Sequence, residues 1–268
     1  MNSLAHATHP AQPLMLRADR DGVATLTLNR PAQRNALSLA LITELLDAVE
    51  AIGKDRSIRA VVIAANGPVF SSGHDLKELR ANPGRQAYEA LFGRMSQLML
   101  ALTRLPQPVI AKVHGVATAA GCQLVATCDL AVASDDALFC TPGVNIGLFC
   151  STPMVALTRA VGRKPAMEML LTGEAIDAET ALRIGLINRI VAPEALDGAV
   201  DALLATILAK SPLPLAIGKS AFYAQAELGL DAAYAYAGEA MTRNMMARDA
   251  EEGIDAFLAK RAPKWEGR

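Results

Sequence analysis

VFSSGHDLK, at residues 69–77, is the most informative stretch of this sequence, and GVATAAGCQ, at residues 115–123, has the same character. Each follows an apolar run, residues 60–65 and 109–113, typical of a β-strand covered on both faces. If each stretch opens a helix, its first N–H groups have no partner inside the helix, and the helix dipole favours negative charge there. Two such turns can bind a carbonyl oxygen that becomes an enolate. Two ordinary strand-to-helix connections give the same pattern, so the residues alone leave both interpretations open.

The sequence around these stretches predicts alternating strands and helices. Residues 14–17 and 23–28 are β-type runs on either side of an Asp-Gly turn, and Ser38 is a plausible N-cap for a helix that ends at Gly53. Further expected elements are a helix at 86–104, strands at 130–133 and 187–191, and helices at 153–160, 164–171, 178–184, 194–209, 213–227, 231–247 and 250–260. The last third is therefore helical, either as a cap on the core or as an oligomerisation surface.

Composition excludes several classes of protein. The 268 residues carry 26 Lys and Arg against 27 Asp and Glu, a formal charge of 26 − 27 = −1, and 52 % are hydrophobic. Such a chain is globular, and its charge gives no attraction to nucleic acid. Its apolar runs are far shorter than the roughly 20 residues that span a bilayer, so we expect no membrane partner. Residues 1–13 lack the features of a secretory signal and are expected to form a flexible tail of a cytoplasmic protein.

The four cysteines show no metal-binding pattern. Cys122, Cys128, Cys140 and Cys150 have no close CxxC pair, so we expect buried thiols and no metal site. No GxGxxG follows an early strand, which argues against a Rossmann dehydrogenase. No GxSxG is present either, which argues against a serine hydrolase.

Several motifs in order resemble the crotonase, or enoyl-CoA hydratase/isomerase, superfamily. They are LNRP (28–31), RNAL (34–37), FSSGHDLK (70–77), AGCQL (120–124), CD (128–129), GE (173–174) and the segment 181–191. The resemblance covers roughly residues 14 to 262. It implies an α/β fold with a spiral of ββα units over residues 14–200. It also implies a helical C-terminal region, residues 201–268, through which the chain forms a homotrimer, commonly a dimer of trimers.

The resemblance further implies an acyl-CoA thioester as ligand, with CoA as part of the substrate and no separate cofactor. The oxyanion hole falls on the backbone N–H groups of His74 and Ala120. Residues implied in binding CoA are Arg34, Ala36, Ser72, Asp75 and Leu76, with Gly121 at the helix start and Lys260 or Arg261 reaching the 3′-phosphate across a subunit boundary. For the last two, a solvated charged helix end is an equal alternative.

The sequence departs from the family at two catalytic positions. Gln123 and Gly143 stand where the hydratases have glutamates, and the single glutamate of the isomerases also falls at Gly143. Glutamine can orient a water molecule but cannot exchange a proton near neutral pH, and glycine offers no side chain. We therefore expect an enoyl-CoA hydratase-type enzyme with a relocated base. The alternatives are a non-hydrating acyl-CoA-binding protein or another family activity, such as an isomerase, lyase or thioesterase.

Few residues can supply the relocated base. The loop 140–152 contains no carboxylate, and Cys150 needs a neighbouring base to become a nucleophile. The His74 imidazole is a candidate if its ring turns toward the thioester, although it could equally face solvent. A gain of hydration on replacing both Gln123 and Gly143 with glutamate would support the family geometry and weaken the hypothesis of a relocated base.

Overall fold

The computed structural model describes residues 12–268, so residues 1–11 of the expected tail lie outside the described part of the chain. Its larger sheet has the strand order β1-β2-β3-β4-β6-β9. Its strands are β1 (Met15–Arg20), β2 (Val23–Leu28), β3 (Ala60–Ala65), β4 (Val109–Val113), β6 (Leu130–Ser134) and β9 (Arg189–Val191). Only β1 and β2 pair antiparallel, as the predicted hairpin, and the other neighbours are parallel. A smaller sheet has the order β5-β7-β8.

The helices confirm the periodicity found in the sequence, with ends displaced by no more than two residues. They are α1 (Leu39–Lys54), α3 (Arg85–Arg104), α5 (Ser151–Ala160), α6 (Arg163–Thr172), α7 (Ala178–Ile184), α8 (Leu196–Leu208), α9 (Pro212–Gln225), α10 (Leu230–Met245) and α11 (Arg248–Leu258). Two further helices, α2 (Leu76–Ala81) and α4 (Ala120–Thr127), begin inside the two small-residue stretches. As predicted, the Ser38 side chain caps α1 by accepting the Leu41 N–H at 3.3 Å.

Strand β3 explains the uninterrupted apolar run at residues 60–65. Val61 and Ile63 face the main core, which contains the apolar sides of α1, α3 and α4. Ala60 and Val62 belong to a second cluster, which α8 completes on the opposite face of the sheet. Because both faces are covered, no polar residue alternates with the apolar ones.

Three short strands were not predicted from the sequence. β5 (Val116–Thr118) and β7 (Leu138–Cys140) pair in parallel, and β8 (Ile176–Asp177) adds to β7 antiparallel. The expectation that 187–191 is the only strand after Pro153 is therefore wrong. Strands of two or three residues show no period to detect, and β5 lies within a stretch of small residues.

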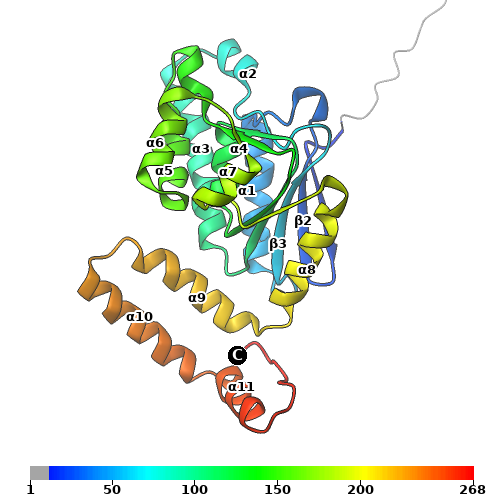
Figure 1. Cartoon of the computed structure of the whole chain (residues 1–268), viewed down its shortest axis with the longest axis vertical. Coiled ribbons are helices and arrows are strands. Elements are labelled where there is room, and N and C mark those ends of the chain that lie inside the picture. The colour runs from blue at the N-terminus through cyan, green and yellow to red at the C-terminus, as the bar shows by residue number, and fades with distance from the viewer. Residues whose placement is uncertain (1–11) are drawn as a thin grey trace, which may run out of the picture.

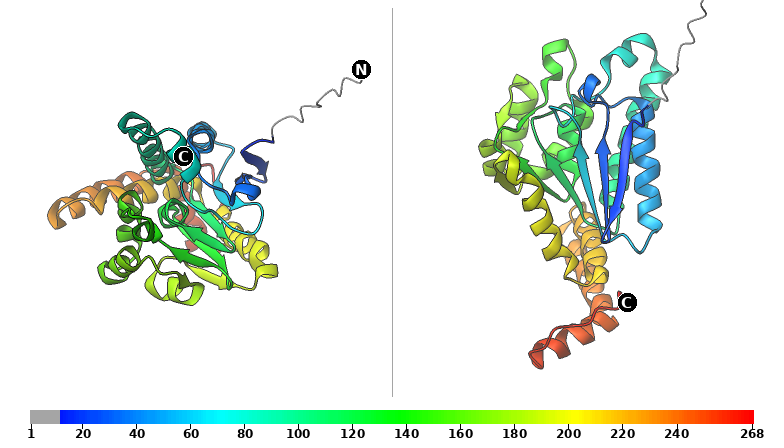
Figure 2. Two further views of the ribbon diagram at one scale, coloured as in Figure 1. Left: turned by 90° about the horizontal axis from the view of Figure 1, so that it is seen from above. Right: turned by 90° about the vertical axis from the view of Figure 1, so that its right-hand side faces the viewer.

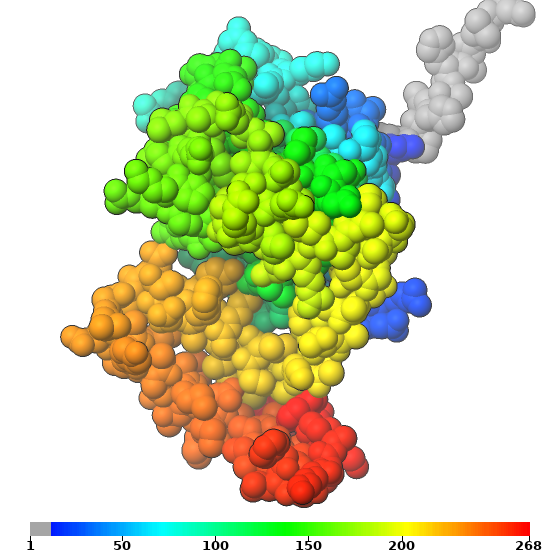
Figure 3. Space-filling model, viewed as in Figure 1, coloured from blue at the N-terminus to red at the C-terminus, as the bar shows by residue number. Residues whose placement is uncertain are grey.

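The last three helices form an arm that projects from the core (Figures 1 and 2). We call α9, α10 and α11 the C-terminal arm. In this arm α9 has no fully buried residue, and α10 has one, Ala240. The space-filling view shows the arm as a separate mass below the core (Figure 3). The expected division at residue 200 lies inside α8, which packs on the sheet, so the arm begins after this helix.

A buried ion pair joins the arm to the core. The Lys219 Nζ of α9 lies 2.6 Å from the Asp129 carboxylate and donates to two core carbonyl oxygens, each at 2.9 Å. The Tyr223 hydroxyl donates to the same carboxylate at 2.8 Å. Burial lowers the Lys219 pKa, an effect that Asp129 opposes. Asp129 of the CD motif therefore anchors the arm.

No single helix in residues 12–268 has both the length and the apolar character to cross a bilayer. One pair, Pro193–Leu208 and Pro212–Gln225, meets both needs jointly but is bent by 103°. The first member of this pair covers a face of the sheet.

Candidate functional site

The two small-residue stretches lie against each other. The Ser71 N–H donates to the Val116 carbonyl at 3.1 Å, and the Thr118 N–H donates to the Ser71 carbonyl at 2.9 Å. A Cβ on Gly73 would lie 2.9 Å from the Ala119 Cβ and 3.2 Å from the Ala120 nitrogen. A Cβ on Gly121 would lie 2.6 Å from the Ser71 oxygen. Glycine at both positions thus allows the backbones to approach this closely.

The backbone around His74 is held on one edge by residue 37. The Leu37 N–H donates to the Gly73 carbonyl at 2.8 Å, and the Asp75 N–H donates to the Leu37 carbonyl at 3.2 Å. In an extended segment the intervening residue directs its own N–H to the opposite edge. For His74 this is the edge that carries the start of α4. Among the described residues neither the His74 N–H nor the Ala120 N–H donates a hydrogen bond.

An unusual backbone conformation at Ala119 sets the start of α4. Ala119 has φ 51° and ψ −115°, although it is not glycine. Such a conformation costs on the order of 1–3 kcal/mol and is found mostly at functional sites. Hydrogen bonds hold it in place, because the Ala119 N–H donates to the Cys140 carbonyl and its carbonyl accepts the Gln123 N–H, both at 2.9 Å.

The predicted CoA-binding residues from two segments come together beside these turns. The Ser72 N–H donates to the Arg34 carbonyl at 3.0 Å, and Ala36 is buried next to them. Leu76, which is half exposed, begins α2. Sequence reasoning missed Asn35, whose buried amide donates to the carbonyls of Asn66 and Val69 at 2.8 Å. Asn35 is part of the RNAL motif, which marked this segment in the sequence. The motif does not indicate that the Asn35 side chain bonds to two backbone carbonyls.

The Asp75 side chain is engaged by the protein's own donors. It accepts the Lys77 and Glu78 N–H groups at the start of α2 and pairs with the Arg30 guanidinium at 3.0 Å. Burial raises the pKa of Asp75, but the Arg30 bond and the two backbone bonds outweigh this effect and lower it. The Asp75 carboxylate therefore stabilises the turn and the start of α2.

The His74 side chain packs into the protein. Its ring meets the Phe92 ring of α3 edge to face, with centroids 5.3 Å apart and planes at 76°. Both ring nitrogens are buried and have no hydrogen-bond partner among the described residues. Burial lowers the His74 pKa, and the Leu37 backbone opposes this effect in part.

Gln123 and Gly143, the two positions expected to correspond to the family glutamates, differ in the space around them. Gln123 of α4 is buried, and its Oε1 has no partner in the part of the chain that the structure describes. Gly143 lies in a 3-10 turn (Pro142–Ile146), where a Cβ would lie 2.9 Å from both the Cys150 Sγ and the Leu148 carbonyl oxygen. A glutamate therefore cannot be introduced at Gly143 while the loop that follows keeps its position. The Gln123→Glu, Gly143→Glu variant therefore requires a shift of this loop.

Comparison with known proteins relates this geometry to a family. The sequence profile described as Enoyl-CoA hydratase/isomerase matches residues 18–268. The chain belongs to the enoyl-CoA hydratase/isomerase family. Enoyl-CoA hydratase domain-containing protein 3, mitochondrial, of Rattus norvegicus is 48 % identical over 246 residues, which are 92 % of this chain and 82 % of that protein.

Two further comparisons extend this result. The 2,3-dehydroadipyl-CoA hydratase of Escherichia coli (strain K12) is 37 % identical over 92 % of this chain and 96 % of that protein. The crystal structure of an enoyl-CoA hydratase from Mycobacterium smegmatis is 56 % identical, with a TM-score of 0.93, over 95 % of this chain and 99 % of that one. These likenesses confirm the expected α/β crotonase fold with its helical C-terminal region.

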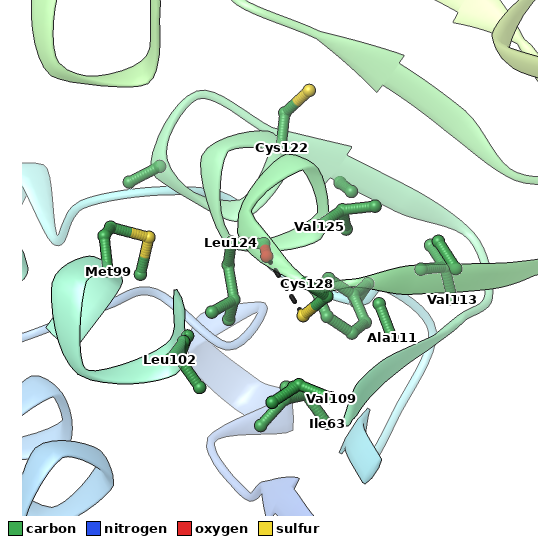
Figure 4. Close-up of a cluster of buried hydrophobic side chains, with 14 of the residues drawn as sticks. Ile63, Met99, Leu102, Val109, Ala111, Val113, Cys122, Leu124, Val125 and Cys128 are labelled. Atoms are coloured by element: carbon green, nitrogen blue, oxygen red, sulfur yellow. Dashed lines mark hydrogen bonds between the residues drawn. The ribbon is translucent and has the colours of Figure 1, made fainter. Parts of the chain in front are cut away.

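The cysteines of this family member are buried and unlinked. Figure 4 shows Cys128 and Leu124 directed toward Ile63 and Val109, with Cys122 on the opposite side of α4. The Cys128 thiol donates to the Leu124 carbonyl at 3.2 Å. Burial raises the pKa of Cys150, which favours the thiol over the nucleophilic thiolate. Residues 12–268 contain no group of three His, Cys, Asp or Glu side chains able to hold a metal ion.

The basic residues of the family's C-terminal region lie at the far end of the arm. Arg261 forms a two-point pair with Glu252 of the same chain, at 2.6 and 2.8 Å. Lys260 follows α11 and is exposed. The structure does not bring these cations to the turns at His74 and Ala120 within one chain, so a role at the 3′-phosphate needs a second subunit and stays a prediction.

Proposed function

We propose that this protein binds an acyl-CoA thioester and polarises its carbonyl between the N–H groups of His74 and Ala120. One observation carries the proposal: two N–H groups without partners lie on two turns that contact each other. A donor of this kind contributes about 3–4 kcal/mol to an oxyanionic transition state. The family membership supports the ligand class, because the named relatives include enoyl-CoA and dehydroadipyl-CoA hydratases.

The reaction we propose is of enoyl-CoA hydratase type with a base other than the family's two glutamates. Gln123 can hold water through its amide, and its unpartnered Oε1 is available for this. No side chain can occupy the position of Gly143 without displacing its neighbours. The second candidate is an acyl-CoA-binding protein without turnover, which the absence of a carboxylate at these two positions favours.

Two measurements on the purified protein separate these candidates. Turnover is followed by the loss of the enoyl absorbance of crotonyl-CoA and longer enoyl-CoA thioesters. Binding is followed by calorimetry with butyryl-CoA, a saturated thioester. Turnover supports the enzyme, and binding without turnover supports the second candidate. Absence of both would remove the basis for the proposed site.

We also propose a homotrimer or a dimer of trimers, assembled through the C-terminal arm. The exposed apolar residues of the arm support an assembly, since they have no cover within the chain. For the cellular location we keep the cytoplasm as the proposal, although the rat relative is named as mitochondrial. Fractionation of cells that express the tagged protein tests the location.

A further inference from the structure

Helix α11 has little apolar contact with the rest of the chain. Its buried residues are Asp249 and Ala256, and one of these is a carboxylate. Ile254, Phe257 and Leu258 on its apolar side are exposed. The position of α11 within the chain therefore depends mainly on polar contacts.

These polar contacts converge on the Asp249 carboxylate, which is only 3 % exposed. It accepts the Glu266 N–H at 2.7 Å, the Gly267 N–H at 2.9 Å and the hydroxyl of Ser211. The Asp249 N–H donates in turn to the Arg268 carbonyl at 2.9 Å. Burial raises the pKa of Asp249, but the bonds it accepts outweigh this effect and lower it. The carboxylate thus binds both the start of α9 and the residues that follow α11.

The side chain of Trp265, the only tryptophan in the sequence, makes a second bridge. Its indole N–H donates to the carbonyl of Ala209, which follows α8, at 2.9 Å. Its ring lies against Gly253 of α11, where a Cβ would be 3.1 Å from the ring. One side chain therefore joins α11 to residues 209–211, the connection between α8 and α9.

The chain on both sides of this bridge is held in place. Arg59, which precedes β3, donates to the carbonyls of Leu208 and Lys210 at 3.1 and 2.5 Å, so the core fixes the connection. Beyond α11, Lys260 has a φ of 52°, the left-handed conformation that ends many helices. The residues after this turn run back toward the start of α9, as Figure 1 shows.

We infer that residues 262–268 act as a latch, a segment that opens and closes while the core stays folded. In the closed state the latch holds α11 against the connection, so the exposed apolar side of α11 has one fixed direction. In the open state α11 separates from the connection. All of the latch except Trp265 is exposed, and a few polar bonds hold it, which is typical of a segment that opens locally. The inference does not depend on the proposed acyl-CoA binding.

The fluorescence of Trp265 reports the state of the latch. On addition of urea, we expect its emission to shift to longer wavelength, and its quenching by acrylamide to rise, before the far-ultraviolet helix signal is lost. Two separate transitions are the mark of local opening. Coincident transitions in wild type would mean that the latch opens only when the whole chain unfolds, and would overturn the inference.

Asp249→Asn should open the latch without urea. The substitution keeps the size of the side chain but replaces one acceptor oxygen with a donor, which faces N–H groups that then lose their partner. We expect long-wavelength emission in buffer and exchange of the α11 amides in D₂O at least about tenfold faster than in wild type. The α8 amides should exchange at the wild-type rate, because α8 packs on the sheet.

Two glycine-to-valine variants provide a matched pair that leaves Asp249 intact. Gly253→Val places a branched side chain where even a Cβ would be 3.1 Å from the Trp265 ring, so it should give the emission and α11 exchange expected for Asp249→Asn. Gly238→Val in α10 has open space around it and should keep the wild-type emission and α11 exchange. Both variants introduce the same side chain into a helix, so a difference between them reflects the contact with Trp265. Wild-type emission and α11 exchange in Gly253→Val would overturn the inference, even if Asp249→Asn fails to fold.

Discussion

At the scale of single residues, three glycines determine how closely the backbones of the site approach and where a side chain has room. Gly73 and Gly121 let one backbone approach another, and a Cβ at either would meet main-chain atoms within 3.2 Å. A Cβ at Gly143 would lie 2.9 Å from both the Cys150 thiol and the Leu148 carbonyl oxygen. The first two create the pair of turns, whereas the third excludes a side chain. Glycine therefore allows close backbone contact at Gly73 and Gly121, whereas at Gly143 the surrounding atoms leave no room for a side chain.

Proline at Ala120 removes the N–H that the proposed hole requires. Ala120 is the first residue of α4, so no helical hydrogen bond is lost, but the unusual conformation of Ala119 must change to accept the ring. We expect Ala120→Pro to reduce kcat by about 100- to 1000-fold, the usual loss for one oxyanion donor. Steady-state turnover of enoyl-CoA measures it. Ala120→Gly keeps the N–H and serves as the control, and a folded proline variant at full rate would refute the assigned hole.

Crowding at Gly143 predicts opposite effects for two glycine-to-alanine substitutions. Gly143→Ala should lower the free energy of unfolding by about 1–3 kcal/mol, because the methyl group meets backbone and thiol. Gly198→Ala in α8 has open space and should raise it by about 0.5–1 kcal/mol, the usual gain within a helix. Urea unfolding of both variants provides the comparison. Equal stability of the two would mean that the loop moves freely away from Gly143.

At the scale of elements, the arm depends on one polar contact with the core. Lys219 of α9 is nearly buried and reaches Asp129, which also accepts the Val109 N–H at 2.7 Å. Removing one member of a buried pair costs more than the pair contributes, because the other charge remains in a poor environment. The attachment of α9 should therefore be sensitive to changes at either residue.

Lys219→Met is expected to lower the free energy of unfolding by about 3–5 kcal/mol. Adding Asp129→Asn should recover part of this loss, since the unpaired charge is then removed. Lys112→Met is the matched control, because Lys112 pairs with the exposed Asp197 and contributes about 0–1 kcal/mol. Thermal or urea unfolding distinguishes these variants, and comparable losses at Lys219 and Lys112 would contradict the buried-pair account.

The end of the arm should respond to acid through Glu252. The bonds from Arg261 and from the Lys264 N–H lower the Glu252 pKa to about 2, from an ordinary value of 4.5. A carboxylate with a depressed pKa stabilises the fold above pH 4.5, and that contribution is lost as the pH falls toward 2. Glu252→Gln should flatten the dependence of stability on pH within this window. The unfolding midpoint measured from pH 6 to 2 tests it, and parallel curves for the variant and wild type would exclude Glu252 as the cause.

The sequence predicted the long helices and the paired turns, but not the contacts between distant loops. Helices such as α3 repeat their apolar residues over several turns, so their period is visible. The crowding of Gly143 arises because the loop that follows folds back and brings Leu148 and Cys150 against it. No local sequence pattern indicates this contact. Likewise, the contacts of the Asp75 side chain with Arg30 and the start of α2 were not predicted from the sequence. Tertiary contacts account for each of these differences.

At the scale of the whole molecule, the arm exposes more apolar surface than a monomer needs. Leu230, Tyr234, Met246, Phe257 and Leu258 are each more than 70 % exposed. Patches of this kind mark surfaces where proteins associate. The core has its own two clusters of buried apolar residues.

Charged residues on this surface should therefore dissociate the proposed assembly. We expect wild type to sediment as a trimer or hexamer, and Leu230→Glu with Phe257→Glu to sediment as a smaller species. Secondary structure should be retained, because both side chains are exposed in the single chain. Sedimentation velocity and circular dichroism measure the two properties. A wild type that sediments as a monomer would leave the exposed surface without the proposed role.

The contact between the two turns also orders events in time. His74 and Ala120 come from stretches that the whole of α3 and strand β4 separate along the chain, and they meet only when Ser71 pairs with β5. Refolding from denaturant will thus regain its far-ultraviolet helix signal first and its capacity to capture thioester last. Thioester binding will therefore be detected only after the two turns have come together, and a compact intermediate that forms earlier will give no binding signal.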